Sequence, residues 1–170
     1  MTEQQPYRLV ERFPEFELRD YPDYTLVECE VTGDFMAAGN AAFYPLVNYI
    51  SGRNETGQKM AMTAPVLQET RDKVHHTVSF VLPAGMKPGD VPVPKDARVR
   101  VNHVAGHRAA VRSFGGSWKE ARFMENAARL RAAVAGAGLV PEGNVYFARF
   151  DPPWKPGFLK KNEVLLRVSG

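Results

Sequence analysis

Residues 52–66 read GRNETGQKMAMTAPV, a polar, glycine-containing loop that runs directly into the start of an apolar strand. In an extended backbone, side chains two positions apart point to the same face, which places Met60 beside Met62. Methionine is flexible and polarizable, so such a pair can adapt to a large flat apolar ligand. It can equally fill an ordinary core, and the segment alone leaves both interpretations open.

The composition is that of a globular chain. Its 170 residues, 44% hydrophobic and 24% charged, are enough for one domain with a substantial core. The net charge of +3 and the pI near 9.1 make the chain mildly basic. No long Lys/Arg run alternates with aromatic residues, so we expect no nucleic-acid partner. No run of about 18 apolar residues predicts a membrane span.

The termini and the single cysteine bear on location. Residues 1–6 are polar and lack the apolar segment of a signal peptide. Cys29 is the only cysteine, which excludes an internal disulfide and a thiolate-rich metal site. These features predict a cytoplasmic protein with a flexible tail over residues 1–6 and a single domain over residues 7–170.

Alternation of apolar and polar residues predicts the strands of the first half. The pattern is clearest in Thr25–Val31, where Cys29 shares the apolar face with two valines and is expected to be a small buried residue. Two more strands are predicted near residues 62–68 and 74–82.

A helix is predicted between these strands, from Asp34 to Ile50. Aspartate is a favoured N-cap and Gly52 can end the helix, while Pro45 predicts either a kink or a short regular part. The apolar face follows the spacing i, i+3, i+4, i+7 and comprises Phe43, Leu46, Val47 and Ile50.

The second half repeats this order of elements. Strands are predicted over residues 99–104, 108–114, 144–150 and 163–168. Ser117–Glu120 has the pattern of a capping box and would open a helix that reaches about Ala135, ended by Gly136 and Gly138. Its expected apolar face comprises Phe123, Ala127, Leu130 and Val134, and its polar face comprises Lys119, Arg122, Asn126 and Arg129.

Each half is therefore a ββαββ unit, and the two units cover about residues 16–82 and 98–168. We predict an α+β fold in which the duplicated units form one curved, eight-stranded antiparallel sheet with two α-helices packed against it.

Motifs of known catalytic sites are missing from the sequence. No nucleophile elbow, phosphate-binding loop, zinc-binding histidine pair or dinucleotide fingerprint occurs. The scattered acidic residues define no acid–base pair, so we expect a binding protein and keep an enzyme as the lesser alternative.

The segment Lys59–Val66, KMAMTAPV, resembles the signature of the SOUL family of haem-binding proteins. Further blocks are similar to family segments and occur in the family's order: Phe16–Tyr21, Phe80–Pro83, Ala110–Gly116, and Asp151–Pro156 followed by Lys161–Val164. The resemblance covers the chain from about residue 7 to its end and implies a distorted barrel built from the two units.

The resemblance also implies non-covalent, reversible binding of haem or protoporphyrin in a hydrophobic cleft, by a monomer or weak dimer that serves as a carrier or buffer. Such a cleft needs an apolar floor for the macrocycle and cations at its rim for the propionates. The implied floor and aromatic lid comprise Leu46, Tyr49, Ile50, Met60 and Met62, with Trp154 and Phe158. The implied rim comprises Arg53, Lys59, Lys155, Lys160 and Lys161. Trp154 could instead plug one end of the sheet, and the basic residues could form a solvated surface.

An axial ligand for haem iron is in question because the chain departs from the family at one position. The member that gave the family its name has a histidine after the arginine of the opening strand, where this chain has Asp20. Branches without that histidine are more similar to this chain, and they bind porphyrins with little dependence on the metal. A carboxylate suits haem iron poorly, which leaves Tyr21, His103 and His107 as weak candidates.

Two alternative functions remain open. The duplicated ββαββ arrangement also resembles bacterial drug-sensor domains, so the chain could bind small hydrophobic or amphipathic molecules in general. A site for organic cations would present buried carboxylates, whereas residues 52–66 supply Arg53 and Lys59. A tetrapyrrole-modifying enzyme is the lesser alternative.

Overall fold

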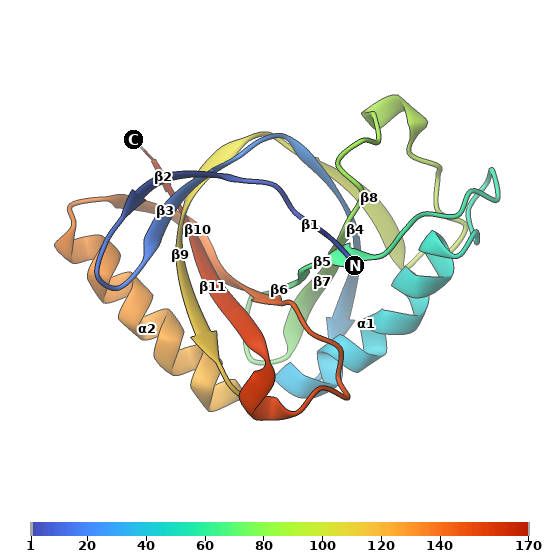
Figure 1. Cartoon of the computed structure of the whole chain (residues 1–170). Coiled ribbons are helices and arrows are strands. Elements are labelled where there is room, and N and C mark those ends of the chain that lie inside the picture. The colour runs from blue at the N-terminus through green and yellow to red at the C-terminus, as the bar shows by residue number, and fades with distance from the viewer. Residues whose placement is uncertain (1, 170) are drawn as a thin grey trace.

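Eleven strands and two α-helices make up the computed structural model, which describes residues 2–169 (Figure 1). The elements of the first unit and the strands before it are β1 (Glu3–Gln4), β2 (Arg8–Arg12), β3 (Glu17–Tyr21), β4 (Tyr24–Thr32), α1 (Phe35–Ile50), β5 (Thr63–Ala64), β6 (Val66–Thr70) and β7 (His75–Val81). The second unit comprises β8 (Val99–Val104), β9 (His107–Gly115), α2 (Glu120–Gly136), β10 (Val140–Arg149) and β11 (Lys161–Ser169). Short 3₁₀ turns lie at Pro88–Asp90 and Gly157–Leu159.

The large sheet has the strand order β2-β3-β9-β11-β10-β6-β7-β4-β8, with antiparallel pairing throughout. Apart from β2, this order is symmetric about the boundary between β10 and β6, so that β3, β4, β6 and β7 correspond to β8, β9, β10 and β11. The predicted α+β fold and the duplication are confirmed. The sheet has nine strands where eight were predicted, because β2 adds an edge strand.

The curved sheet does not close into the barrel that the family resemblance implied. Its edges are β2 and β8, and these two strands do not pair with each other. Both helices lie outside the curve, α1 against β4 and β7 and α2 against β9, β10 and β11 (Figure 1). Across residues 2–169, no helix is both long and apolar enough to cross a membrane.

The predicted N-terminal tail contains a strand. In β1, Glu3 and Gln4 pair in parallel with Thr63 and Ala64 of β5, and the backbone amide of Gln5 donates to the Ala64 carbonyl at 2.9 Å. Met1 of the tail and Gly170 at the end of the predicted domain lie outside the described residues.

Helix α1 begins where the sequence predicted. The Asp34 carboxylate accepts a hydrogen bond from the Ala37 amide at 2.7 Å, and the helix continues through Pro45 to Ile50. The predicted apolar face was partly wrong, because Phe43 is exposed. The side that contacts the sheet begins at the first residue of the helix and comprises Phe35, Ala38, Ala42, Pro45, Leu46, Tyr49 and Ile50.

Helix α2 buries the four apolar residues that the spacing predicted. The capping box was wrong: the helix starts two residues later, at Glu120, and Lys119 occupies the N-cap without a side-chain hydrogen bond. Asn126, predicted on the polar face, is buried, and its Oδ1 accepts a hydrogen bond from Arg112 Nε at 2.9 Å. A polar partner on β9 thus explains a polar residue in the buried stripe.

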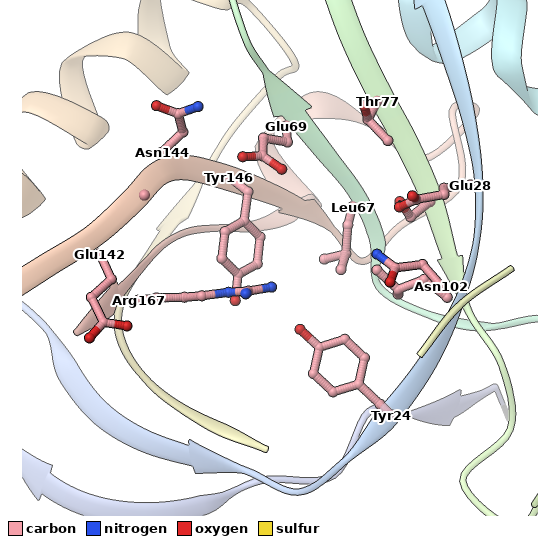
Figure 2. A pocket seen from close by; sticks show the side chains of 13 residues that line it. Tyr24, Glu28, Leu67, Glu69, Thr77, Asn102, Glu142, Asn144, Tyr146 and Arg167 are labelled. Atoms are coloured by element: carbon pink, nitrogen blue, oxygen red, sulfur yellow. The ribbon is translucent and has the colours of Figure 1, made fainter. Parts of the chain in front are cut away.

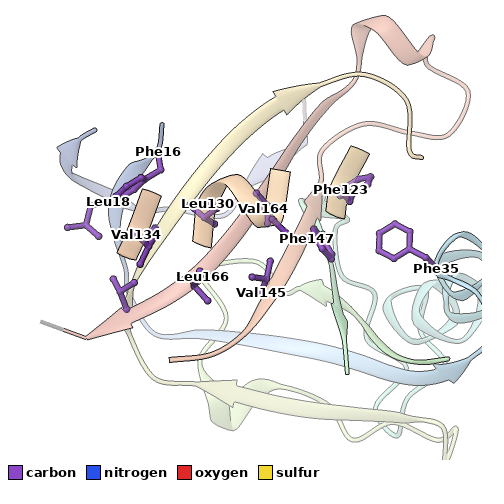
Figure 3. Packing of buried hydrophobic residues seen from close by; sticks show 13 residues of the cluster. Phe16, Leu18, Phe35, Phe123, Leu130, Val134, Val145, Phe147, Val164 and Leu166 are labelled. Carbon is purple, nitrogen blue, oxygen red and sulfur yellow. The ribbon is translucent and has the colours of Figure 1, made fainter. Parts of the chain in front are cut away.

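The buried apolar residues form three clusters. One lies between α2 and the sheet and includes Phe35 from the start of α1 (Figure 3). The second lies under α1 and contains Cys29, which confirms its expected burial. The third lines the concave face of the sheet and includes Tyr21 and Tyr146.

Candidate ligand-binding site

Helix α1 carries no charged residue in its sequence FMAAGNAAFYPLVNYI. One side packs on the sheet, yet Met36 and Tyr44 on the other side are 44% and 76% exposed. Phe43, at the edge between the two sides, is 46% exposed although its ring centre lies 6.0 Å from that of Phe80 on β7. Helix α2, its counterpart in the second unit, carries exposed Glu and Arg residues on its outer side. A helix with apolar residues all round is normally covered by other groups, so the outer side of α1 is a candidate binding surface.

The segment between β10 and β11, residues 150–160, is the second exposed apolar feature. Its two large aromatic side chains, Trp154 and Phe158, are 84% and 83% exposed. The loop is held by Asp151, whose carboxylate accepts hydrogen bonds from Lys155 Nζ at 2.8 Å and from the Lys161 amide. Trp154 therefore does not plug the end of the sheet, and both rings are accessible to a ligand.

Arg149, the last residue of β10, connects this loop to α1. Its guanidinium carbon lies 5.1 Å from the ring centre of Phe35 and 5.4 Å from that of Trp118. Lys160 Nζ in turn lies 3.8 Å from the centre of the Trp118 ring. Arg149 thus lies next to the start of α1, at the point of the chain where the loop begins. We call the exposed apolar side chains of these two elements the α1–loop surface, which comprises Met36, Phe43, Tyr44, Trp154, Phe158 and Leu159.

Two buried arginines differ in their partners. Arg19 donates hydrogen bonds to both carboxylate oxygens of Glu163, at 3.1 and 2.9 Å. Arg149 is 7% exposed, and its Nη1 donates to Gln68 Oε1 at 2.7 Å. Its Nε has no hydrogen-bond partner, and no carboxylate within residues 2–169 lies at ion-pair distance. Burial lowers the pKa of Arg149 to about 10, so it is a cation in an apolar setting without a counter-ion from the protein.

Three of the predicted floor residues belong to the core. Leu46, Tyr49 and Ile50 are buried under α1 in the cluster that contains Cys29. The Tyr49 hydroxyl donates to the Pro92 carbonyl at 2.6 Å, which fixes its ring. A ligand would contact these side chains only if α1 moved away from the sheet.

The remaining predicted floor and rim residues of the first unit lie at the far end of α1. The Met60 amide donates to the Ile50 carbonyl at 2.8 Å, and Met60 is half-buried. Met62, Arg53 and Lys59 are exposed in the same region. A cavity of about 540 Å³ there is lined by Tyr49 and Arg53, the only two predicted site residues that it brings together. Since α1 is 16 residues long, about 24 Å separate this region from the start of the helix.

The predicted rim lysines of the second unit lie beside the aromatic loop. Lys155 is paired with Asp151, and Lys160 lies on the Trp118 ring. Lys161 Nζ lies 4.5 Å from the centre of the Phe150 ring. Of the predicted site, the structure therefore brings together Trp154, Phe158 and these three lysines.

The candidate iron ligands lie elsewhere and have other partners. The Asp20 carboxylate is paired with Arg8 and Arg108, which lower the pKa of that carboxyl. Tyr21 is buried and accepts a hydrogen bond from Arg19 Nη1, and burial raises its pKa. These partners compete with iron for the lone pairs of both residues.

The two candidate histidines are also hydrogen-bonded. His103 Nδ1 lies 2.9 Å from the Thr25 hydroxyl oxygen, and His107 Nε2 lies 2.8 Å from that of Tyr24. Burial lowers the pKa of His107 to about 4, which keeps its imidazole neutral. Within residues 2–169, no group of three or more His, Cys, Asp or Glu side chains could hold a metal ion.

A cavity on the concave face was not anticipated from the sequence (Figure 2). Its volume is about 390 Å³, and its polar lining includes Tyr24, Glu28, Glu69, Glu142, Tyr146 and Arg167. Figure 2 shows Tyr24, Tyr146 and Arg167 pointing toward one another from three strands. Glu28 is paired with Arg100 at 2.7 Å. The only feature of the sequence that pointed to this cavity was the alternation in β4, which puts Glu28 on the face opposite to Val27 and Cys29. The other lining residues reach Glu28 only through the pairing of distant strands.

Comparison with known proteins gives two groups of similar chains. A family model described as SOUL heme-binding protein matches residues 2–167. Heme-binding protein 1 of Mus musculus is 34% identical over 128 residues, which are 71% of this chain and 66% of the relative. Heme-binding protein 2 of Homo sapiens is 29% identical over 159 residues, which are 89% of this chain and 77% of the relative.

Solved structures with a similar fold have low sequence identity. The C-terminal domain of EcmrR has a TM-score of 0.69 at 11% identity, with 96% of this chain and 98% of that chain covered. SAV2435 bound to tetraphenylphosphonium has a TM-score of 0.55 at 13% identity, with 92% and 94% covered. At this identity the similarity shows the fold alone.

Proposed function

Because this chain belongs to the SOUL heme-binding protein family, we propose that it binds a tetrapyrrole, haem or protoporphyrin, non-covalently and reversibly on the α1–loop surface. The proposal rests on one observation above all. An uncharged helix presents an apolar outer side next to a loop that exposes two aromatic rings. A flat macrocycle would cover both and remove their apolar area from water.

The charged groups around this surface suit the propionates of a porphyrin. Arg149 precedes the loop and contacts Phe35 of α1, and Lys160 ends the loop with its Nζ on the Trp118 ring and donating to the Pro153 carbonyl at 3.2 Å. Lys155 is engaged by Asp151, so it contributes less. Carboxylates paired with such cations form charge-assisted hydrogen bonds, which would orient the macrocycle.

Iron is not required for this mode of binding. All four histidines are hydrogen-bonded to other groups: His75 to Asp72, His76 to Thr70, His103 to Thr25 and His107 to Tyr24. The apolar contacts and carboxylate pairing are the same for haem and for the metal-free ring. We therefore expect haemin and protoporphyrin to bind with similar affinity, which suits a cytoplasmic carrier or buffer, acting as a monomer or weak dimer, better than a redox protein.

Parallel titrations with haemin and metal-free protoporphyrin test the proposal. The Soret band and the fluorescence of Trp118 and Trp154 report binding. Tyr44→Ala should weaken both ligands about 3- to 10-fold through lost aromatic contact. Met124→Ala on the outer side of α2 is the matched control, since Met124 is also an exposed apolar helix residue, and it should change nothing. Absence of saturable binding by either ligand would overturn the proposal.

A second candidate ligand, an organic cation, is favoured by the cavity on the concave face. Three carboxylates, Glu28, Glu69 and Glu142, line it with one guanidinium, that of Arg167, whose carbon lies 6.0 Å from the ring centre of Tyr146, so the cavity already holds a cation beside an aromatic ring. The fold similarity to SAV2435 suggests tetraphenylphosphonium as the probe. Glu69→Gln with Glu142→Gln should weaken this cation and leave protoporphyrin unaffected, because the two sites lie on opposite faces of the sheet. Displacement of protoporphyrin by the cation would contradict separate sites.

A further inference from the structure

We infer that Arg149 is the residue that binds a carboxylate of the ligand, pairing with one propionate of a tetrapyrrole held on the α1–loop surface. The inference rests on the proposed function and identifies the group that would recognise the acid function of the ligand. Neither the sequence patterns nor the family motifs single out Arg149, which ends an apolar strand just before the aromatic loop.

The guanidinium of Arg149 is incompletely paired. Arginine has five N–H donors, and Arg149 uses its Nη1 on Gln68, while Nε and Nη2 have no hydrogen-bond partner in the described chain. Removing a cation from water without an anion is costly, and the other deeply buried arginine, Arg19, has Glu163. A carboxylate supplied by a ligand would give Arg149 the pairing that Arg19 obtains from the protein.

The guanidinium also lies among aromatic rings. Phe35, Trp118 and Phe123 surround it, with ring centres 5.1 to 5.4 Å from its carbon. These rings exclude water and would strengthen a charge-assisted hydrogen bond. The guanidinium also lies where the two elements meet, since Arg149 directly precedes the loop and its carbon is 5.1 Å from the ring centre of Phe35, the first residue of α1; a macrocycle over both elements would have a propionate within reach.

Gly39, in the second turn of α1, lies close to the same guanidinium. Glycine weakens a helix interior, and here a Cβ at this position would lie 3.6 Å from Arg149 Nη1. The helix therefore approaches the guanidinium closely at a point without a side chain. A larger residue at position 39 would lie against the guanidinium and take up the room beside Nη1.

The test combines a change in the protein with a change in the ligand. Wild type and Arg149→Met are titrated with protoporphyrin and with its dimethyl ester, which keeps the ring and lacks both carboxylates. We expect wild type to prefer the diacid, and Arg149→Met to weaken the diacid about 10- to 100-fold while leaving the ester unchanged. Arg129→Met, an exposed arginine of α2, is the matched control for general charge and should change neither titration.

Other outcomes separate the possible failures. Equal loss of diacid and ester in Arg149→Met would mean that Arg149 acts through packing, and no loss of either would mean that it plays no part; both overturn the inference. If wild type binds neither the diacid nor the ester, the proposed function itself is refuted, and the inference about Arg149 is refuted with it.

Gly39→Val provides a second test should Arg149→Met not fold. It retains the cation and should weaken the diacid more than the ester. Equal weakening of both ligands, or of neither, would overturn the inference.

Discussion

Replacing Arg149 with methionine is expected to change the free energy of unfolding by no more than about 1 kcal/mol, although the side chain is deeply buried. The reason is that its charge is costly in the folded state. Burial lowers the pKa from 12.5 to about 10, and at 1.36 kcal/mol per unit this corresponds to roughly 3 kcal/mol that favours removal of the charge.

Two losses offset this gain. Gln68 Oε1 is fully buried and would lose its donor, at a cost of about 1–3 kcal/mol. The ring contacts with Phe35, Trp118 and Phe123 contribute about 1 kcal/mol together at these distances. The sum lies near zero, which is unusual for the loss of so large a buried side chain.

Arg19→Met is the matched comparison, because it removes the guanidinium that pairs with both oxygens of the buried Glu163 carboxylate and leaves only Lys161 Nζ, at 4.0 Å. That variant should lose about 3–5 kcal/mol. Urea unfolding at pH 7, followed by far-ultraviolet circular dichroism, measures both variants against wild type. If Arg149→Met loses as much stability as Arg19→Met, the guanidinium is a stabilising element and the argument from its missing counter-ion is refuted.

Three further predictions concern individual side chains. Leu46→Ala should lower the free energy of unfolding by about 2–5 kcal/mol, since Leu46 is fully buried, and should leave the affinity of the folded protein for protoporphyrin unchanged. Weakened binding would mean that Leu46 does contact the ligand. The pKa of His107 is lowered to about 4 from about 6.5 in the unfolded chain, which therefore binds more protons between these values. Stability should fall by about 1–2 kcal/mol, after allowing for partial exposure, as the pH drops from about 6.5 to 4. The urea midpoint should fall with pH in this range in wild type and in His103→Gln, but not in His107→Gln. The same pH dependence in His107→Gln would mean that other groups cause it. Burial raises the pKa of the Cys29 thiol, so a disulfide reagent should label it only as the chain unfolds, and rapid labelling of native protein would contradict its burial.

The sequence predicted those parts of the fold that local patterns determine. Strand β8 was predicted with its observed bounds, and α1 with its N-cap Asp34, because alternation and capping are local signals. Strand β2, RLVER, was missed because this edge strand has no buried face and so no alternation. Phe43 was expected to be buried but lies at the edge of the buried face, because that helix has no charged residue to mark its outer side.

The candidate site was predicted less completely, for a related reason. The aromatic loop was recognisable because Trp154 and Phe158 stand out among prolines and lysines. Arg149 could not be distinguished from a surface arginine, since its burial depends on Phe35 and Phe123 from the two helices. The concave cavity is assembled from strands that are far apart in the sequence and adjacent only through the order of the sheet.

The duplication provides an internal comparison between the two units. Both helices cover the same kind of sheet surface. Stability of the fold therefore requires a buried apolar stripe on each helix, but it does not require any particular residues on the outer sides. Two features break the symmetry: α1 lacks charge on its outer side, and the β10–β11 connection is an aromatic loop over residues 150–160 where the equivalent β6–β7 connection is the short turn 71–74. Neither departure is needed to fold a ββαββ unit, because the other unit folds without it. The two elements that carry these departures meet at Arg149 and its ring partner Trp118, through the buried Phe35 of α1 and through Lys160 of the loop, and this is the reason to look for the ligand there rather than along the symmetric parts of the sheet.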